Sequence, residues 1–417
     1  MELSDQIFRR ESGRLVAALT RLFGVHNLTL AEDVVQDAFS RALRVWQTQG
    51  IPENPSAWLM TTAKNRALDI VRRERTARRF APELGRLLDT EWTLAPLVEE
   101  AFALSTLRAE QLRMMFSCCH PKLASAAQLA LILNILCGFA AKEIAGALLI
   151  RQAAVEKRIS RGKHVLAAST RLFDLTDREF EARLETVGRA LYLLFNEGYH
   201  GASESAVRVE LCHEALRLTL LLLEYPAAAT PAMHALAALM SLHAARLPAR
   251  VDQAGDLSAL VDQDRSRWDA LWISEGLKHL ELSAAGSELT AYHLEAALAA
   301  AHVSAGSLAA TDWGGMVALY DRLFALAPSP VVALNRAIAI GQRDGAARGL
   351  EALSAIQDAD RLAQYPFYAA AFGELELRRA AFSSAAAHFQ RALALARNDA
   401  ERRFLEKRLA HCRDRSG

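Results

Sequence analysis

The chain has 417 residues, of which 52% are hydrophobic and 23% are charged, and it contains 11 prolines and 21 glycines. This composition excludes a collagen-like or low-complexity protein and indicates a soluble globular chain of two or three domains. Alanine and leucine, which favour helices, outweigh β-branched residues in the hydrophobic fraction. The composition therefore predicts an all-α fold.

The net charge of +1 hides an uneven distribution along the chain. Residues 1–169 carry 23 Lys and Arg against 17 Asp and Glu, whereas residues 170–417 carry 26 against 31. The first part is thus +6 and the second −5. A basic first part suggests an anionic partner, and an acidic second part disfavours nucleic acid as the ligand of that part.

Five cysteines, an odd number, predict no disulfide framework, and the N-terminus lacks the pattern of a secretory signal. Residues 123–141 and 225–245 are uncharged but are interrupted by polar residues or prolines, so we interpret them as buried helices. We expect a reducing cytoplasmic location and no membrane partner. Residues 118–121, Cys-Cys-His-Pro, lack a second pair at zinc-site spacing, and buried cysteines are the favoured interpretation. We expect no metal and no cofactor.

In chain order, helical periodicity first predicts an amphipathic helix over residues 30–46. Pro52, Asn54 and Pro55 interrupt the pattern, and a second helix is predicted from Trp58 to about Arg79. The periodicity weakens between residues 81 and 103, which predicts a linker. Helices resume near Leu104 and continue to about Leu166, and the composition becomes Ala-rich and acidic after a boundary near residue 174.

The second predicted helix is strongly basic. The segment from Thr61 to Phe80 contains seven Lys and Arg residues and only two acidic residues, so its net charge is +5. An apolar stripe of Leu59, Ala63, Ala67, Ile70 and Val71 accounts for its buried side. Its other faces offer hydrogen-bonding and basic groups suited to nucleic acid, namely Asn65, Arg66, Asp69, Arg72 and Arg73. The alternative is a basic helix that is simply solvated.

Residues 141–159 have the pattern of a helix-turn-helix motif. Ile144, Leu148, Val155 and Ile159 are expected to face the core, and Ile150 to fill the turn. The outward face could reach phosphates and base edges in a major groove. It carries Arg151, Gln152, Glu156, Lys157 and Arg158, and it is extended by Arg161 and Lys163.

The last hundred residues carry a faint repeat of tetratricopeptide type, shifted by 36 residues. Its two copies place small residues where two helices of a hairpin would cross and larger ones where neighbouring hairpins would meet. They are Ala337, Gly349, Leu353 and Ile356, then Gly373, Ala385, Phe389 and Ala392. The alternative is an Ala-rich helical bundle without true repeats.

Two polar motifs interrupt the otherwise apolar second part. They are residues 196–201, Asn-Glu-Gly-Tyr-His-Gly, and residues 262–265, Asp-Gln-Asp-Arg. They could form a ligand pocket or an active site. A helix cap with a buried ion-pair network is the favoured interpretation.

Taken together, these motifs resemble a known family. The first part looks like region 2 of the extracytoplasmic-function sigma factors of bacterial RNA polymerase, on residues 31–39, Trp46, 55–59 and 65–73. The helix-turn-helix then lies where region 4 belongs. The second part resembles the subgroup with a long tetratricopeptide-like C-terminal extension, on residues 193–199, 262–265, 311–313 and 329–332.

The resemblance implies four segments: region 2 over residues 1–80, a linker over 81–103, region 4 over 104–173 and a helical regulatory domain over 174–417. Region 2 would dock against the polymerase clamp through Asp33, Gln36, Asp37, Phe39 and Arg41. It would melt and read the −10 element through Asn65, Arg66, Asp69, Arg72 and Arg73. Region 4 would meet the polymerase flap, and would meet the −35 element through the outward face of the motif.

Two departures from the family pattern concern detail. Leu149 stands where many helix-turn-helix motifs have glycine, so the conformation of the turn is open. The loop between the two region 2 helices is short, which leaves little sequence from which to infer the captured −10 base.

We therefore expect a non-enzymatic sigma subunit that binds core RNA polymerase and promoter DNA. Its C-terminal domain would regulate it, by contacting the sigma part or by receiving another protein. One alternative is a helix-turn-helix regulator that acts without being a polymerase subunit. Another is a helical scaffold or enzyme whose basic face is incidental.

Overall fold

The computed structural model describes residues 2–24, 27–77, 102–148, 150–168, 177–200, 207–252 and 256–416. Within these ranges the chain forms helices, with one isolated antiparallel bridge between Val251 and Leu257 and no strand. The predicted all-α fold is confirmed. The chain divides into two compact units, unit 1 (Met1–Leu194) and unit 2 (Phe195–Gly417). None of the described helices is long and apolar enough to cross a lipid bilayer.

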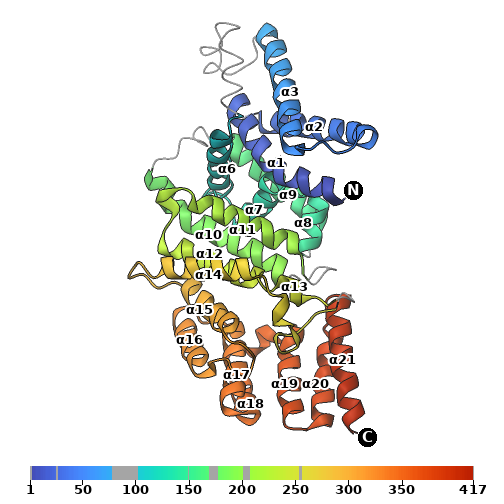
Figure 1. Cartoon of the computed structure of the whole chain (residues 1–417), viewed down its shortest axis with the longest axis vertical. Helices are drawn as coiled ribbons and strands as arrows, with labels where there is room; N and C mark the ends of the chain where they lie inside the picture. The colour runs from blue at the N-terminus through green and yellow to red at the C-terminus, as the bar shows by residue number, and fades with distance from the viewer. Residues whose placement is uncertain are drawn as a thin grey trace. The chain divides into compact units, whose positions relative to one another are not determined.

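Unit 1 begins with three helices (Figure 1), which pack against one another through buried apolar side chains. They are α1 (Glu2–Phe23), α2 (Leu28–Gln49) and α3 (Pro55–Ala77). Apolar residues at helical spacing give α2 one continuous buried face, which ends in Trp46. The Trp46 ring packs edge-on against Trp58 of α3, with ring centroids 5.6 Å apart. Gly50, at φ +82°, ends α2 and donates its N–H to the Trp46 carbonyl at 3.0 Å.

The next helices pack directly on the first three. They are α6 (Leu104–Cys118), α7 (Ser125–Leu131), the π helix η2 (Ile132–Leu136), α8 (Ala141–Leu148) and α9 (Gln152–Ala167). Gly13 of α1 lies so close to Leu136 that a Cβ atom there would overlap the Leu136 main chain. Gly162 of α9 similarly faces the Leu131 side chain, whose nearest atom is 2.7 Å from the position of a Cβ. Gly13 therefore lets the two groups of helices come together in one unit, and Gly162 lets α9 pack closely on α7 within the second group.

Helix α10 (Asp177–His200) begins in unit 1 and ends in unit 2. Its first turns belong to unit 1 because Phe180 stacks on Phe116 of α6 at 4.1 Å and Arg183 donates to the Phe116 carbonyl at 3.4 Å. The boundary expected near residue 174 and almost all of the linker expected over 81–103 lie outside the described residues.

Unit 2 is built around α12 (Pro231–Ala244), most of whose side chains are buried. Gly276 lets α14 approach α12 closely, because a Cβ at Gly276 would lie 2.7 Å from the Leu242 side chain. The neighbouring elements are α11 (Val209–Leu223), η3 (Pro226–Ala228), α13 (Leu247–Arg250), η4 (Leu260–Asp262), η5 (Arg265–Arg267), α14 (Ala270–Ser283), α15 (Ala291–Ser304) and α16 (Trp313–Leu326).

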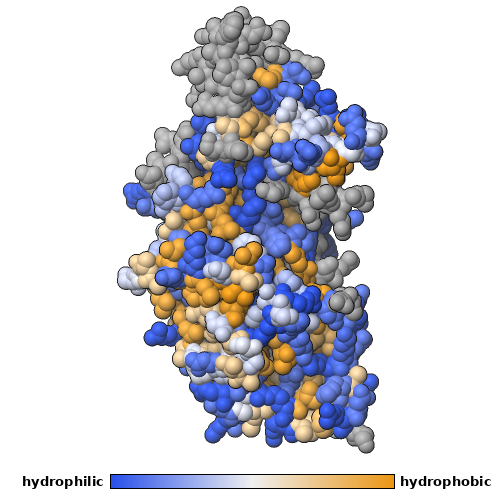
Figure 2. All heavy atoms as spheres, viewed as in Figure 1, coloured by the Kyte–Doolittle hydropathy of each residue, from blue (hydrophilic) through white to orange (hydrophobic). Residues whose placement is uncertain are grey.

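The rest of unit 2 consists of helical hairpins. Their elements are α17 (Pro330–Asp344), α18 (Ala346–Ser354), η6 (Ala359–Leu362), α19 (Pro366–Arg378), α20 (Phe382–Ala394) and α21 (Asp399–Ser416). Gly341 and Gly349 meet where α17 crosses α18, and the Phe389 ring of α20 lies over Gly373 of α19. Small residues thus sit at the crossings, as the repeat pattern requires, while membership in the tetratricopeptide class stays a prediction. The outer face of α21 is hydrophilic (Figure 2).

Candidate nucleic-acid interface

Helices α8 and α9 form the two arms of the predicted helix-turn-helix. Ile144, Val155 and Ile159 are buried between them and the rest of unit 1, as predicted. The Ile150 N–H donates to the Ala145 carbonyl at 3.1 Å and so closes the turn. Glu143 caps the start of α8 by accepting the Ala140 N–H at 2.8 Å. Leu149 lies outside the described residues, as does the side chain of Leu148.

The outward face of α9 is polar and mostly open to solvent. Arg158 is half-buried, and Gln152 donates to Glu156 at 2.8 Å along the helix surface. The exposed members of the predicted set are Arg151, Gln152, Glu156, Lys157 and Arg161. Because the N-terminus of a helix also attracts anions, this end of α9 is suited to a phosphate backbone.

Lys163, the last member of that set, faces inward instead. Its ammonium lies 2.7 Å from both carboxylate oxygens of Glu32 in α2, and both side chains are about one-quarter exposed. Beside this ion pair, a cleft of about 540 Å³ opens between α2 and α9. It is lined by Leu28, Thr29, Asn134, Ala141, Glu156, Ile159, Ser160, Lys163, His164 and Ala167.

The residues expected to meet the polymerase lie on α2. Phe39 differs from the others, because it is 7% exposed and stacks on Phe8 of α1 at 4.6 Å. It therefore supports the position of α2 from inside unit 1. The exposed members of the set are Asp33, Gln36, Asp37 and Arg41.

The residues expected to read the −10 element lie on α3, above a buried stripe of Leu59, Ala63 and Ala67. Asn65 and Asp69 are exposed, and Arg66 is half-buried. The Arg66 guanidinium pairs with the Asp37 carboxylate at 3.1 Å, so the two predicted sets of region 2 meet on one surface. Arg72 and Arg73 belong to α3, but their side chains lie outside the described residues.

Cys118 and Cys119 are buried at the end of α6. Burial raises the pKa of both thiols, to about 12 for Cys119, so both are neutral at pH 7. The neighbouring His120 accepts the Lys122 N–H at 3.1 Å. In the part of the chain that the structure describes, no group of three or more His, Cys, Asp and Glu side chains is placed to hold a metal ion.

The two polar motifs of the second part both contact the short segment of unit 2 that carries α13. Tyr199 contacts Arg250, and Gln263 accepts a hydrogen bond from Arg246. Arg246 and Arg250 are not among the functional residues predicted from the sequence. A signal was present, because the two arginines directly follow the long uncharged helix and are four residues apart, a spacing that puts side chains on the same face of a helix.

Two family models and one similar protein match this chain. Residues 7–77 match the model of sigma-70 region 2. Residues 183–284 match a family of unknown function, DUF6596. The chain is 37% identical over 401 residues to the uncharacterized protein R00370 of Rhizobium meliloti (strain 1021), and the alignment covers 95% of this chain and 92% of that protein.

Proposed function

We propose a function from the premise that this chain is a sigma-70 family sigma factor, which its match to sigma-70 region 2 over residues 7–77 supports. We infer that it is a sigma factor of the extracytoplasmic-function type. It binds core RNA polymerase, directs it to a restricted set of promoters, and leaves the chemistry of RNA synthesis to the polymerase.

The observation that carries this proposal is the helix-turn-helix arrangement of α8 and α9, which follows region 2 in the same compact unit. A buried apolar side and an exposed basic N-terminus are what a recognition helix needs in a major groove. We assign this motif to region 4 and its contact to the −35 element. The residues assigned are Arg151, Gln152, Glu156, Lys157, Arg158, Arg161 and Lys163.

Region 2 supplies the second contact. Promoter opening needs a surface that holds an unstacked strand, and exposed hydrogen-bonding and basic groups suit that task. We assign the −10 element to Asn65, Arg66, Asp69, Arg72 and Arg73. We assign the polymerase clamp to Asp33, Gln36, Asp37 and Arg41, with Phe39 holding α2 in place.

The test is transcription in vitro with core polymerase over a promoter library. The intact chain is expected to direct initiation at a narrow set of sequences. Lys157→Ala and Asp37→Ala should reduce that initiation at least tenfold while the helical circular dichroism spectrum is retained. Lys122→Ala and Glu181→Ala are the matched controls, since each removes the same charge from an exposed position outside the assigned surfaces.

The same experiment separates the competing functions. A regulator that acts without polymerase would bind closed duplex specifically as an isolated protein, whereas a sigma factor needs core polymerase for specific binding. Absence of promoter-specific initiation for the intact chain would contradict the proposal.

We also propose that the C-terminal domain regulates the sigma part. The support is the opposite net charge of the two parts, +6 and −5, because an acidic module tethered to a basic one can screen its DNA-binding faces. A groove of about 360 Å³ between α16, α17 and α18 offers a place for a protein partner. The test compares the full chain with one that ends at His200, which keeps the contact of Phe180 with Phe116. Unchanged transcription and unchanged DNA affinity would contradict regulation.

A further inference from the structure

Three arginines of unit 2, Arg246, Arg250 and Arg265, form what we call the arginine cluster. Arg246 and Arg250 lie at the two ends of the short segment that carries α13, and Arg265 begins η5. Arg246 is 7% exposed, and the other two are half-buried. The surrounding residues 170–417 are acidic overall, so a concentration of positive charge inside this unit requires an explanation.

Aromatic rings hold the cluster together. The guanidinium groups of Arg246 and Arg265 lie 5.5 and 4.6 Å from the centroid of the same ring, that of Trp268. The Arg250 guanidinium lies 4.2 Å from the centroid of the Tyr199 ring. Cation–π contacts of this kind orient the cations but leave their charge in place.

No carboxylate of the described residues forms an ion pair with any of the three arginines. Arg246 donates to the Gln263 side-chain oxygen at 3.3 Å, and Arg250 donates to the Tyr199 carbonyl at 3.1 Å. Arg265 donates to the carbonyls of His302 and Ala305 at 2.7 and 2.6 Å. All of these acceptors are neutral, so the positive charges are uncompensated.

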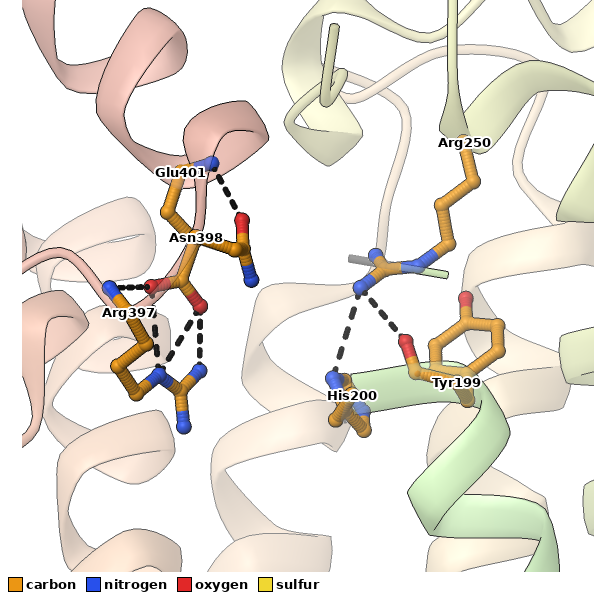
Figure 3. A network of polar contacts seen from close by, with 6 residues as sticks. All are labelled: Tyr199, His200, Arg250, Arg397, Asn398 and Glu401. Atoms are coloured by element: carbon orange, nitrogen blue, oxygen red, sulfur yellow. Dashed lines mark hydrogen bonds and ion pairs between the residues drawn. The ribbon is translucent and has the colours of Figure 1, made fainter. Parts of the chain in front are cut away.

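A neighbouring arginine shows the contrast within one view (Figure 3). Arg397 pairs with the Glu401 carboxylate through its Nε and Nη2 atoms, with the shortest distance 2.5 Å. In the same view, Arg250 points at a main-chain carbonyl and at the His200 ring. A buried charge without a counter-charge is costly, and unit 2 contains one such charge, on Arg246, beside the two half-buried charges of Arg250 and Arg265.

The polar atoms without a partner in the described part of the chain indicate which kind of ligand could bind at the arginine cluster. Arg250 Nε, Arg265 Nη2 and Trp268 Nε1 are buried, and none of them has a hydrogen-bond partner among the residues that the structure describes. All three can only donate hydrogen bonds. Two histidines nearby bring no negative charge, since burial and then the adjacent arginines lower the pKa of His243 and His302 and keep both rings neutral. The missing partner must therefore accept hydrogen bonds and carry negative charge.

We propose that the arginine cluster is a binding site for a small oxyanion, the carboxylate or phosphate group of a small-molecule ligand. Guanidinium forks match the geometry of both groups. Trp268 and Tyr199 supply the remaining polar contacts, since the buried Tyr199 hydroxyl also has no partner in the described part of the chain. Part of the cluster reaches solvent, because Arg250 and Arg265 are half-buried and not fully buried.

The test measures the thermal unfolding temperature of the full chain during titration with inorganic phosphate and, separately, with succinate. Potassium chloride keeps the ionic strength constant in both series. A ligand that binds only the folded chain raises this temperature in a saturable way. A response to phosphate alone identifies a phosphate site, a response to succinate alone a carboxylate site, and a response to both a general oxyanion site. Absence of a saturable response in both series overturns the proposal.

Two variants assign the response to the cluster. Arg246→Met is expected to leave the unfolding temperature without ligand equal or higher, because it removes an uncompensated charge, and to weaken anion binding at least tenfold. Arg250→Met at the half-buried position should weaken binding similarly. Arg336→Met, in an exposed pair with Asp321, is the control and should keep the full response. An anion response that survives in both cluster variants overturns the proposal, whatever their stability.

Discussion

The Lys163 ammonium of α9 lies 2.7 Å from the Glu32 carboxylate of α2, across 131 residues of sequence. This ion pair joins the proposed −35 helix to region 2 within unit 1. Glu32 takes up two of the three N–H donors of Lys163 and offsets its charge, so the ion pair opposes a contact between Lys163 and a DNA phosphate. We expect promoter binding by the proposed sigma factor to weaken this pair.

Glu32→Gln is expected to increase affinity for a promoter duplex that carries the −35 element, measured by fluorescence anisotropy in the presence of core polymerase. A half-buried ion pair of this kind stabilises the closed arrangement by about 1 kcal/mol, which corresponds to about a fivefold change in affinity. Glu181→Gln, at an exposed position of α10, serves as the control. Equal affinities for Glu32→Gln and the unmodified chain would show that the pair does not oppose DNA binding.

Gly349→Ala tests the packing of α18 against α17, the helical hairpin in which Gly349 meets Gly341. A Cβ at this position would lie 2.8 Å from the Gly341 Cα atom and 2.9 Å from the Leu375 side chain. The overlap with main chain should exceed the gain in helix propensity and lower the free energy of unfolding by about 2 kcal/mol, measured by urea denaturation. Gly306→Ala is the matched control, since no atom lies within 4 Å of its Cβ position, and it should change stability by less than about 0.5 kcal/mol.

Local patterns predicted the elements well, because a helix repeats every 3.6 residues and its buried side follows from that period. Val155 and Ile159 of α9, for example, are buried as predicted. Phe39 shows a limit of such reasoning: it belongs to the buried stripe of α2 and also to the family pattern, and only its stacking on Phe8 shows that it lies inside.

Contacts between distant segments were not predictable in this way. The period of α9 does not indicate that Lys163 meets Glu32 in another helix. The arginine cluster was missed for a related reason, since Arg246 and Arg250 resemble the solvated end of an uncharged helix when viewed alone. Their burial depends on Trp268 and Tyr199, which lie 22 and 51 residues away from them in the sequence.

His302 makes unit 2 sensitive to acid. Burial, followed by the charges of Arg246 and Arg265, lowers the pKa of its imidazole from 6.5 to about 4. As the pH falls, the unfolded chain therefore takes up this proton before the folded chain does, and stability decreases between pH 6.5 and pH 4. From pH 7 to pH 5 this group alone should remove about 2 kcal/mol. His302→Gln should reduce the loss of unfolding free energy between pH 7 and pH 5 by that amount, as measured by urea denaturation, and an unchanged pH dependence would contradict the assignment.

Arg397→Met should have an effect on stability opposite to that of Arg246→Met. Glu401 is 2% exposed and receives hydrogen bonds from Arg397, so loss of the guanidinium leaves a buried carboxylate without its counter-charge. We expect the free energy of unfolding at pH 7 to fall by about 2 to 3 kcal/mol, below the range for fully buried pairs because the Arg397 side chain is 28% exposed. The double variant Arg397→Met with Glu401→Leu should recover most of this loss. Urea denaturation of the unmodified chain, Arg397→Met and the double variant measures these changes in the free energy of unfolding. Equal free energies of unfolding for Arg397→Met and Arg246→Met would contradict the distinction between an arginine with a counter-charge and one without.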